Sequence, residues 1–123
     1  MKPKVIVMEA EQISSEELVS LLDRAGIETI VTTRLNELKK IMPDAIIIDE
    51  RAGRGEWELS SRIRDESNVP ILMLGDSDSE IAWVKAVAHD VDFYLPRPFS
   101  PRELIARLKA LIRRYNGIHQ PLA

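Results

Sequence analysis

Short apolar runs recur along the chain, and segments with the 3.6-residue period of helices separate them. The runs predict strands at residues 5–8, 28–31, 45–49, 71–74 and 93–95. Strands that alternate with helices in this way form a parallel sheet that is covered on both faces. We therefore predict an α/β fold with a doubly wound, five-stranded parallel sheet.

The segments between these runs carry the apolar stripes and end signals of helices. The first stripe ends at Gly26, and later stripes are predicted at 35–41 and 57–63. In the segment 79–88 we expect three apolar residues to face inward, with Trp83 as a further candidate: Ile81, Val84 and Ala88.

The last helix has the clearest start and a proposed end. Ser100 is predicted to cap it, Pro101 to take its first position and Glu103 to complete a capping box. Its buried face is predicted to consist of Leu104, Ile105, Leu108, Leu111 and Ile112. Gly117 then suggests a domain over residues 1–116, with 117–123 as a flexible tail or the start of a linker.

Composition narrows the classes of function. The chain has 123 residues, enough for one domain with one core. Its formal net charge of -3, with both signs interspersed, does not favour direct binding of nucleic acid. Without cysteine there are no disulfides or thiolate metal ligands, and no apolar run is long enough to span a bilayer. We expect a cytoplasmic protein that does not bind membranes.

Polar residues gather at the carboxyl ends of the predicted strands, which meet at one edge of a parallel sheet. Ligands of such sheets bind at this edge. The residues expected to converge there are Glu9, Ala10, Glu11, Asp49, Gly75, Asp76 and Arg97. Asp49 stands out, because it ends the buried run 45–48 and a Gly-containing turn follows it.

Three ordered blocks resemble the receiver domain of two-component response regulators. They are residues 43–49, 69–74 and 92–104, and the last block resembles the OmpR-like class of transcription regulators. The resemblance covers nearly the whole chain. It implies the flavodoxin-like arrangement of the sheet, with strand order 2-1-3-4-5 and five helices.

The resemblance implies that Asp49 is the acceptor of a phosphoryl group from a sensor histidine kinase, with Mg²⁺ bound beside it. The family supplies two adjacent acids after the first strand, whereas this chain has Glu9 followed by Ala10. The candidate magnesium ligands are therefore Glu9, Glu11 and Asp49, and the replacement at Ala10 argues against a normal site.

Two more family positions differ here. The family's Thr or Ser after the fourth strand is replaced by Gly75, and its Lys after the fifth strand by Arg97. The peptide bond between Arg97 and Pro98 is expected to be cis, as in the family. Tyr94 aligns with the family's switch aromatic, whose inward turn is coupled to the hydroxyl that Gly75 lacks. The short loop after Asp49 also carries arginines, at positions 51 and 54.

The resemblance also implies a homodimer through the helix at 79–88, the strand at 93–95 and the last helix. The residues expected on this face are Trp83, Lys85, Asp92, Phe93, Glu103, Arg107 and Arg114. Trp83 and Phe93 replace charged residues of the family, which predicts a more apolar face. Contact with DNA is expected only through an output domain outside this chain.

These observations support three hypotheses. The first is a non-enzymatic receiver domain of atypical, pseudo-receiver kind, with weak or no magnesium-dependent phosphorylation at Asp49. The second is a working phospho-acceptor that uses Glu9 or Glu11 and Arg97 as altered ligands. The third is a flavodoxin-like module that binds a small ligand or another protein, which only the fold favours.

Overall fold

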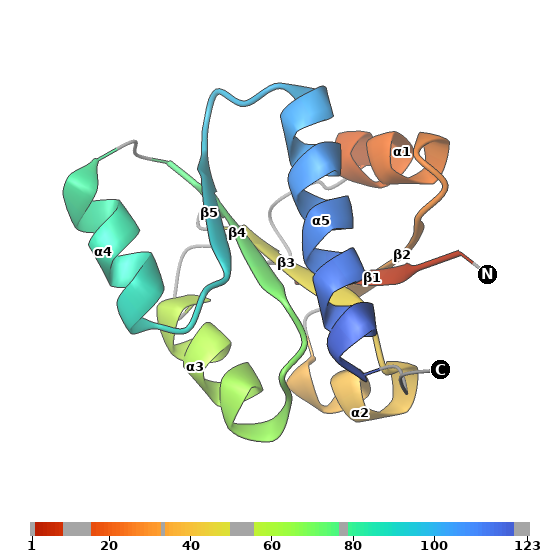
Figure 1. The fold of residues 1–123 in the computed structure, drawn as a ribbon, viewed down its shortest axis with the longest axis horizontal. Coiled ribbons are helices and arrows are strands. Elements are labelled where there is room, and N and C mark those ends of the chain that lie inside the picture. Colours follow the sequence, from red (N-terminus) through yellow and green to blue (C-terminus); the bar gives the residue numbers. More distant parts are fainter. Residues whose placement is uncertain (1, 9–15, 33, 50–55, 77–78, 120–123) are drawn as a thin grey trace.

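The structure of the chain is a computed structural model, and it describes residues 2–8, 16–32, 34–49, 56–76 and 79–119. Its five strands pair in parallel in the order β2-β1-β3-β4-β5 (Figure 1). The strands are β1 (Lys4–Met8), β2 (Glu28–Thr32), β3 (Ala45–Asp49), β4 (Ile71–Gly75) and β5 (Phe93–Pro96). The predicted fold class and strand order are confirmed.

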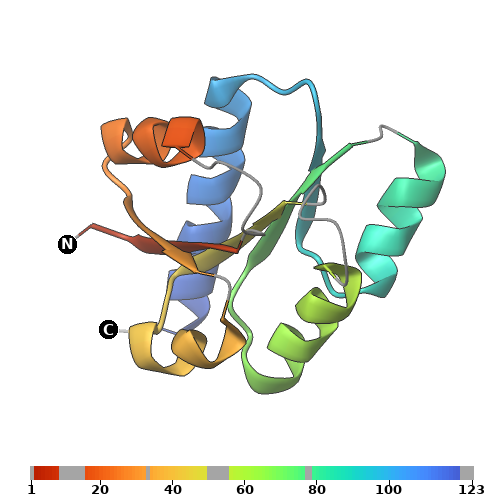
Figure 2. The same ribbon diagram turned by 180° about the vertical axis from the view of Figure 1, so that it is seen from behind.

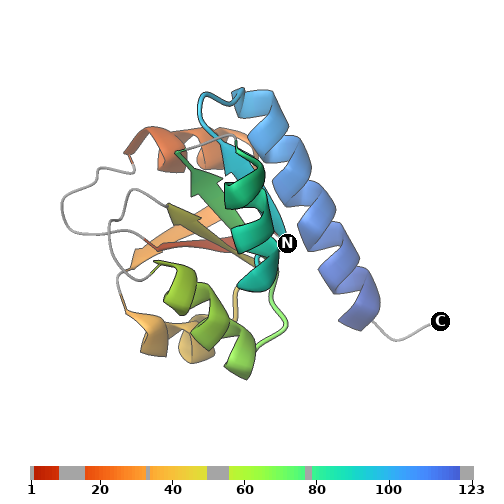
Figure 3. The same ribbon diagram turned by 90° about the vertical axis from the view of Figure 1, so that its left-hand side faces the viewer.

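Helices cover both faces of the sheet. They are α1 (Glu16–Arg24), the 3₁₀ turn η1 (Leu35–Glu37), α2 (Leu38–Ile41), α3 (Glu56–Glu66), α4 (Glu80–Ala88) and α5 (Pro101–His119). α1 and α5 cover one face, and α2, α3 and α4 cover the other (Figures 1 and 2). Figure 3 shows α5 on one side of the strands and α3 on the other. In the described part of the chain, no helix combines the length and apolar character needed to cross a membrane.

Successive side chains of each central strand enter opposite cores, as the two-residue period of a strand requires. In β3, Ile46 and Ile48 pack toward α3 and α4, whereas Ala45 and Ile47 pack toward α1 and α5. Every residue of β3 and β4 is buried. This double burial explains why these strands read as unbroken apolar runs.

Two predicted helix ends are present. Gly26 has φ of 80°, and the bonds from its N–H to Asp23 O and from Ile27 N–H to Leu22 O end α1 in a Schellman motif. At the start of α5, the Ser100 hydroxyl oxygen accepts a hydrogen bond of 3.0 Å from the N–H of Glu103.

The predicted inner face of α4 is wrong. Ile81 and Val84 are 81% and 62% exposed, Ala88 is also exposed, and the buried residues are Ala82 and Ala86. Small side chains face the sheet because aromatic rings fill the neighbouring space, so α4 presents its branched residues to solvent.

The predicted end of the last helix is also wrong. α5 continues through Gly117 to His119, so residues 117–119 belong to the helix. A single glycine weakens a helix by only about 1 kcal/mol, which the packed turns before it can offset. Residues 120–123 lie outside the described part, and the predicted domain boundary stays a prediction.

Candidate functional site

The ends of three neighbouring strands bring the predicted site residues together. Asp49 is the last residue of β3, Gly75 is the last residue of β4, and Arg97 follows β5 directly. The register pairs Asp49 with Leu74 and Gly75 with Pro96, which sets these ends side by side. Asp49 is one of the few buried polar residues of the described chain. The strand order therefore places a buried carboxylate beside a cation.

Arg97 joins the elements of the site. Its Nη2 donates to Asp49 Oδ2 at 2.7 Å, and its Nη1 lies 3.3 Å from Asp76 Oδ1. Nη1 and the backbone N–H of Arg97 also donate to Gly75 O, at 3.2 and 3.0 Å. The Asp49 side chain is 9% exposed and that of Arg97 is 23% exposed. One guanidinium thus bridges two carboxylates, with the charge-assisted bond to Asp49 largely shielded from water.

The described donors do not match the ligands that Mg²⁺ requires. Magnesium binds oxygen ligands in a nearly ideal octahedron, and carboxylates are its usual protein ligands. In the described residues no three His, Cys, Asp or Glu side chains gather, and Arg97 takes Oδ2 of Asp49. The predicted ligands Glu9 and Glu11, like Ala10 and the loop arginines at 51 and 54, lie outside the described residues.

Tyr94 points into the protein beside this site. It is 1% exposed, and its ring lies against the backbone of Gly75. The predicted cis peptide bond between Arg97 and Pro98 is also present. The Tyr94 ring thus points inward and is not an edge residue with its hydroxyl in water.

An aromatic cluster surrounds Tyr94. Trp57 of α3 stacks on it, with ring centroids 6.1 Å apart and planes at 17°. Trp83 of α4 meets Tyr94 edge-on at 5.5 Å and Phe93 at 5.8 Å. The chain has only six Phe, Trp and Tyr residues, two of each, and four of them form this cluster. Sequence reasoning placed Trp57 on a helix but did not foresee the stack, because spacing along one helix says nothing about contacts to another element.

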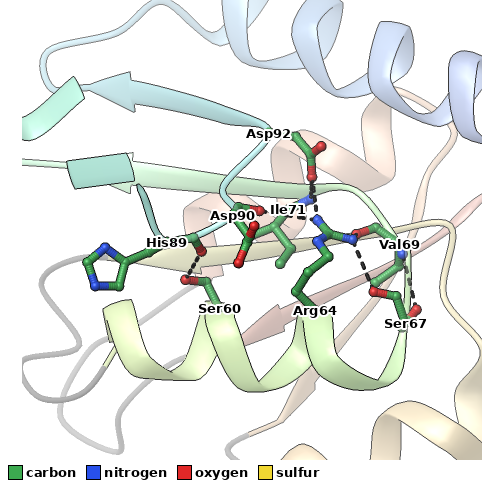
Figure 4. Close-up of polar contacts among 8 residues, drawn as sticks. All are labelled: Ser60, Arg64, Ser67, Val69, Ile71, His89, Asp90 and Asp92. Atoms are coloured by element: carbon green, nitrogen blue, oxygen red, sulfur yellow. Dashed lines mark hydrogen bonds and ion pairs between the residues drawn. The ribbon is translucent and has the colours of Figure 1, made fainter. Parts of the chain in front are cut away.

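A second polar cluster lies at the opposite end of β4 and β5 (Figure 4). Arg64 of α3 donates to the carbonyls of Ser67 and Val69 at 3.1 and 2.8 Å. It also donates to Asp90 O at 3.2 Å and to Asp92 Oδ2 at 2.7 Å. Asp92 Oδ2 in turn accepts from the N–H of Ile71 at 2.7 Å. Asp92, predicted on the dimer face, therefore ties α3 to β4, and no sequence pattern pointed to Arg64 as its partner.

Ser60 reinforces the same junction. Its buried hydroxyl lies 2.7 Å from the carbonyl oxygen of His89 and 2.8 Å from that of Trp57 (Figure 4). The start of the turn after α4 is thereby fixed to α3.

The remaining residues of the predicted dimer face belong to α4, β5 and α5, and β5 lies between the two helices (Figure 1). Lys85 places its Nζ 4.9 Å from the Trp57 ring centroid, and the Arg107 guanidinium lies 4.8 Å from that of Phe93. Both contacts have cation–π geometry. Glu103 and Arg114 are exposed on α5.

Comparison with known proteins agrees with this architecture. No model of a known protein family matches the chain. The chain is 33% identical over 115 residues to sensory transduction protein RegX3 of Mycobacterium tuberculosis, a match that covers 89% of this chain and 51% of RegX3. RegX3 of Mycolicibacterium smegmatis is 32% identical, with 89% and 50% covered. The chain spans about half the length of the curated relatives it matches.

Solved structures give the same result. A putative response regulator from Chloroflexus aurantiacus superposes with a TM-score of 0.82 at 27% identity, covering 93% of this chain and 100% of that one. The receiver domain of the Francisella response regulator 1452 superposes with a TM-score of 0.78 at 27% identity, covering 92% and 98%. Sequence blocks, strand order, strand-end site and these likenesses agree, and the chain belongs to the receiver domains of two-component response regulators.

Proposed function

We propose that this receiver domain is an atypical one, which signals with weak or no magnesium-dependent phosphorylation at Asp49. The observation that carries the proposal is the 2.7 Å ion pair between Arg97 Nη2 and Asp49 Oδ2, with Asp49 shielded from water. A phospho-accepting carboxylate attacks through one of its oxygens, in line with the leaving group. A guanidinium that holds one of these oxygens lowers its availability as a nucleophile.

The charge of the site supports the same proposal. Two carboxylates at a strand end repel each other, and a divalent cation is one way to neutralise them. Here Arg97 contacts both Asp49 and Asp76. Arginine stays charged at every physiological pH, and its planar fork suits two oxygens at once. Arg97 then takes over the charge balance that Mg²⁺ supplies in an ordinary receiver.

The biological role follows from the family. Response regulators act with sensor histidine kinases, and we propose a kinase as a partner of this chain. The resemblance of residues 92–104 to the OmpR-like class of transcription regulators supports control of transcription through an output domain or a partner protein. In this role the chain turns over no substrate and works by presenting a protein surface.

The proposal is tested by binding of beryllofluoride, a phosphoryl mimic, followed by NMR of the backbone amides with and without Mg²⁺. We expect no magnesium-dependent shifts around Asp49 and Gly75 in the wild type. The matched variant Arg97→Lys restores the compact ammonium of ordinary receivers, and Asp49→Asn supplies the background for each titration. Saturable, magnesium-dependent shifts in the wild type that Asp49→Asn abolishes would instead establish a working phospho-acceptor.

We also propose that the chain forms a homodimer through the outer face of α4, β5 and α5. Three branched residues of α4 form an exposed stripe on this face: Ile81, Val84 and Val87, the last 75% exposed. Contiguous exposed apolar surface of this kind often marks a protein–protein interaction site. The same proposed face carries exposed basic and acidic residues on α5, such as Arg107 and Glu103.

Sedimentation equilibrium tests this dimer. Val84→Asp puts a charge at the centre of the stripe and should weaken the dimer at least tenfold, whereas Met42→Asp, at an even more exposed site directly after α2, should not. Equal dissociation constants for wild type and Val84→Asp would show that the interface lies elsewhere.

A further inference from the structure

The space beside Gly75 is already filled by a side chain from another strand. A Cβ atom built on Gly75 would lie 2.6 Å from Cε1 of Tyr94, and closer still to Cζ and Oη. Non-bonded carbon atoms attract best at about 3.5–4.0 Å, so contacts this short are strongly repulsive. The present position of the Tyr94 ring therefore exists only because residue 75 has no side chain.

The ring cannot easily give way, because other side chains hold it on both sides. Trp57 stacks on one face at 6.1 Å, and Trp83 contacts it edge-on at 5.5 Å. Aromatic pairs at these distances each contribute favourably beyond the area that they bury. Tyr94 is also the largest of the fully buried side chains in the described chain, and protein cores are too dense for such a ring to move by small steps.

Gly75 is held from its other side as well. Its carbonyl oxygen accepts hydrogen bonds from the backbone N–H and the side chain of Arg97. The strand that carries it is paired on both edges, with β3 and with β5. Pairing with β5 and the hydrogen bonds from Arg97 thus oppose a retreat of the backbone at position 75 from the ring.

We propose that Gly75 and Tyr94 form a steric lock, which holds the outer face of α4 and β5 in one conformation whatever the state of Asp49. Tyr94 fixes Trp83, and Trp83 is part of α4, so the inward ring determines where the branched stripe of α4 lies. A two-state element needs two packings of similar free energy. Here Gly75 has no side chain to clash with the Tyr94 ring, so the inward position of the ring does not depend on a movement of residue 75.

The lock is tested with Gly75→Ala, which adds the one atom that the ring excludes. Its matched control is Gly117→Ala, because a Cβ on Gly117 has no atom within 4 Å. The readout is NMR of the tyrosine rings, which is simple because the chain has two tyrosines, Tyr94 and Tyr115. In the wild type we expect nuclear Overhauser effects between Tyr94 and Trp57.

Gly75→Ala should abolish the Overhauser effects between Tyr94 and Trp57 and shift the amide signals of residues 80–88. Gly117→Ala should do neither. If Gly75→Ala keeps the effects and the amide signals, the lock is wrong. Should Gly75→Ala fail to fold, the double variant Gly75→Ala with Tyr94→Leu decides: a folded double variant supports the lock, and an unfolded one refutes it.

The lock does not depend on the proposed loss of phosphorylation, and the two can fail separately. If beryllofluoride binds at Asp49 and the signals of residues 80–88 stay in place, the atypical function is wrong and the lock holds. If the analogue does bind and those signals move, both are wrong.

Discussion

Replacing Arg97 with methionine is expected to destabilise the fold, and most of the loss should depend on Asp49. Methionine has a similar length but no charge and no donor. It leaves Asp49, whose side chain is 9% exposed, as a buried carboxylate without its 2.7 Å partner. The ion pair thus predicts a large effect for a residue that sits at the end of the sheet and contributes little to the apolar core.

The size of the effect follows from the burial of the pair. Removing one member of a buried ion pair costs about 3–5 kcal/mol, and the partial exposure of Arg97 favours the lower end, about 3 kcal/mol. In an Asp49→Asn background the same change breaks no ion pair with residue 49 and removes only hydrogen bonds to the amide oxygen there, to Gly75 O and to the half-exposed Asp76. Exposed contacts of that kind contribute about 1 kcal/mol or less. The coupling between Arg97 and Asp49 is therefore expected to be about 2 kcal/mol.

Urea unfolding of the four proteins, followed by fluorescence of Trp57 and Trp83, measures this coupling. With a slope of about 1.5 kcal/mol/M, a loss of 3 kcal/mol lowers the unfolding midpoint by about 2 M. The exposed Arg102→Met serves as the control and should leave the midpoint nearly unchanged. A loss below about 1 kcal/mol in both backgrounds would show that Arg97 does not neutralise Asp49 in solution.

The same titration checks three further predictions. Arg64→Met should lower the free energy of unfolding by about 2–3 kcal/mol, because it removes hydrogen bonds to three carbonyls and to Asp92. Lys39→Met removes only an exposed 3.8 Å ion pair and should lower it by less than about 0.5 kcal/mol. Equal losses would refute the reasoning. Ser100→Ala should cost about 1 kcal/mol through loss of the α5 cap, and no loss would mean that water replaces it. Ile81→Lys should change stability by less than about 0.5 kcal/mol, whereas Ala82→Lys should prevent folding. If Ile81→Lys were the more damaging change, the inner face of α4 would be the one predicted from the sequence.

The central strands were predictable because they are buried on both faces. Runs such as 45–48 and 71–74 contain only apolar residues, and glycine, proline or charged residues flank them. A strand of this kind has no other stable position in a small α/β domain, so its type follows from the pattern. The strand order was implied by the resemblance to receiver domains. The predicted strand bounds differ from the observed ones by one residue at most.

α4 was not predictable in the same way, because both of its faces are apolar. One face carries Ile81 and Val84, the other Ala82 and Ala86, and periodicity favours the larger side chains for the core. In the structure the alanine face is buried instead, since Trp83 and Tyr94 fill the space beside the helix. Only contacts between distant elements decide such a case.

The candidate site was predictable in its members and not in its contacts. Parallel strands bring their carboxyl ends together, so Asp49, Gly75 and Arg97 had to meet. That Arg97 would bridge Asp49 and Asp76, and that Tyr94 would fill the space beside Gly75, depends on side-chain rotamers. The sequence showed which family groups were replaced, whereas the structure shows what occupies their places.

The two family positions that differ here, Gly75 and Arg97, are in contact, and this contact connects the site to the surface of α4. Arg97 binds Asp49 and the carbonyl of Gly75, while Tyr94 lies against the α-carbon of Gly75 and contacts Trp83. A change at Asp49 can reach α4 along this path only if the backbone of Gly75 moves or the Tyr94 ring turns. Strand pairing opposes the first movement and aromatic packing opposes the second. If both proposals hold, the chain combines a neutralised acceptor with a fixed outer face of α4 and β5.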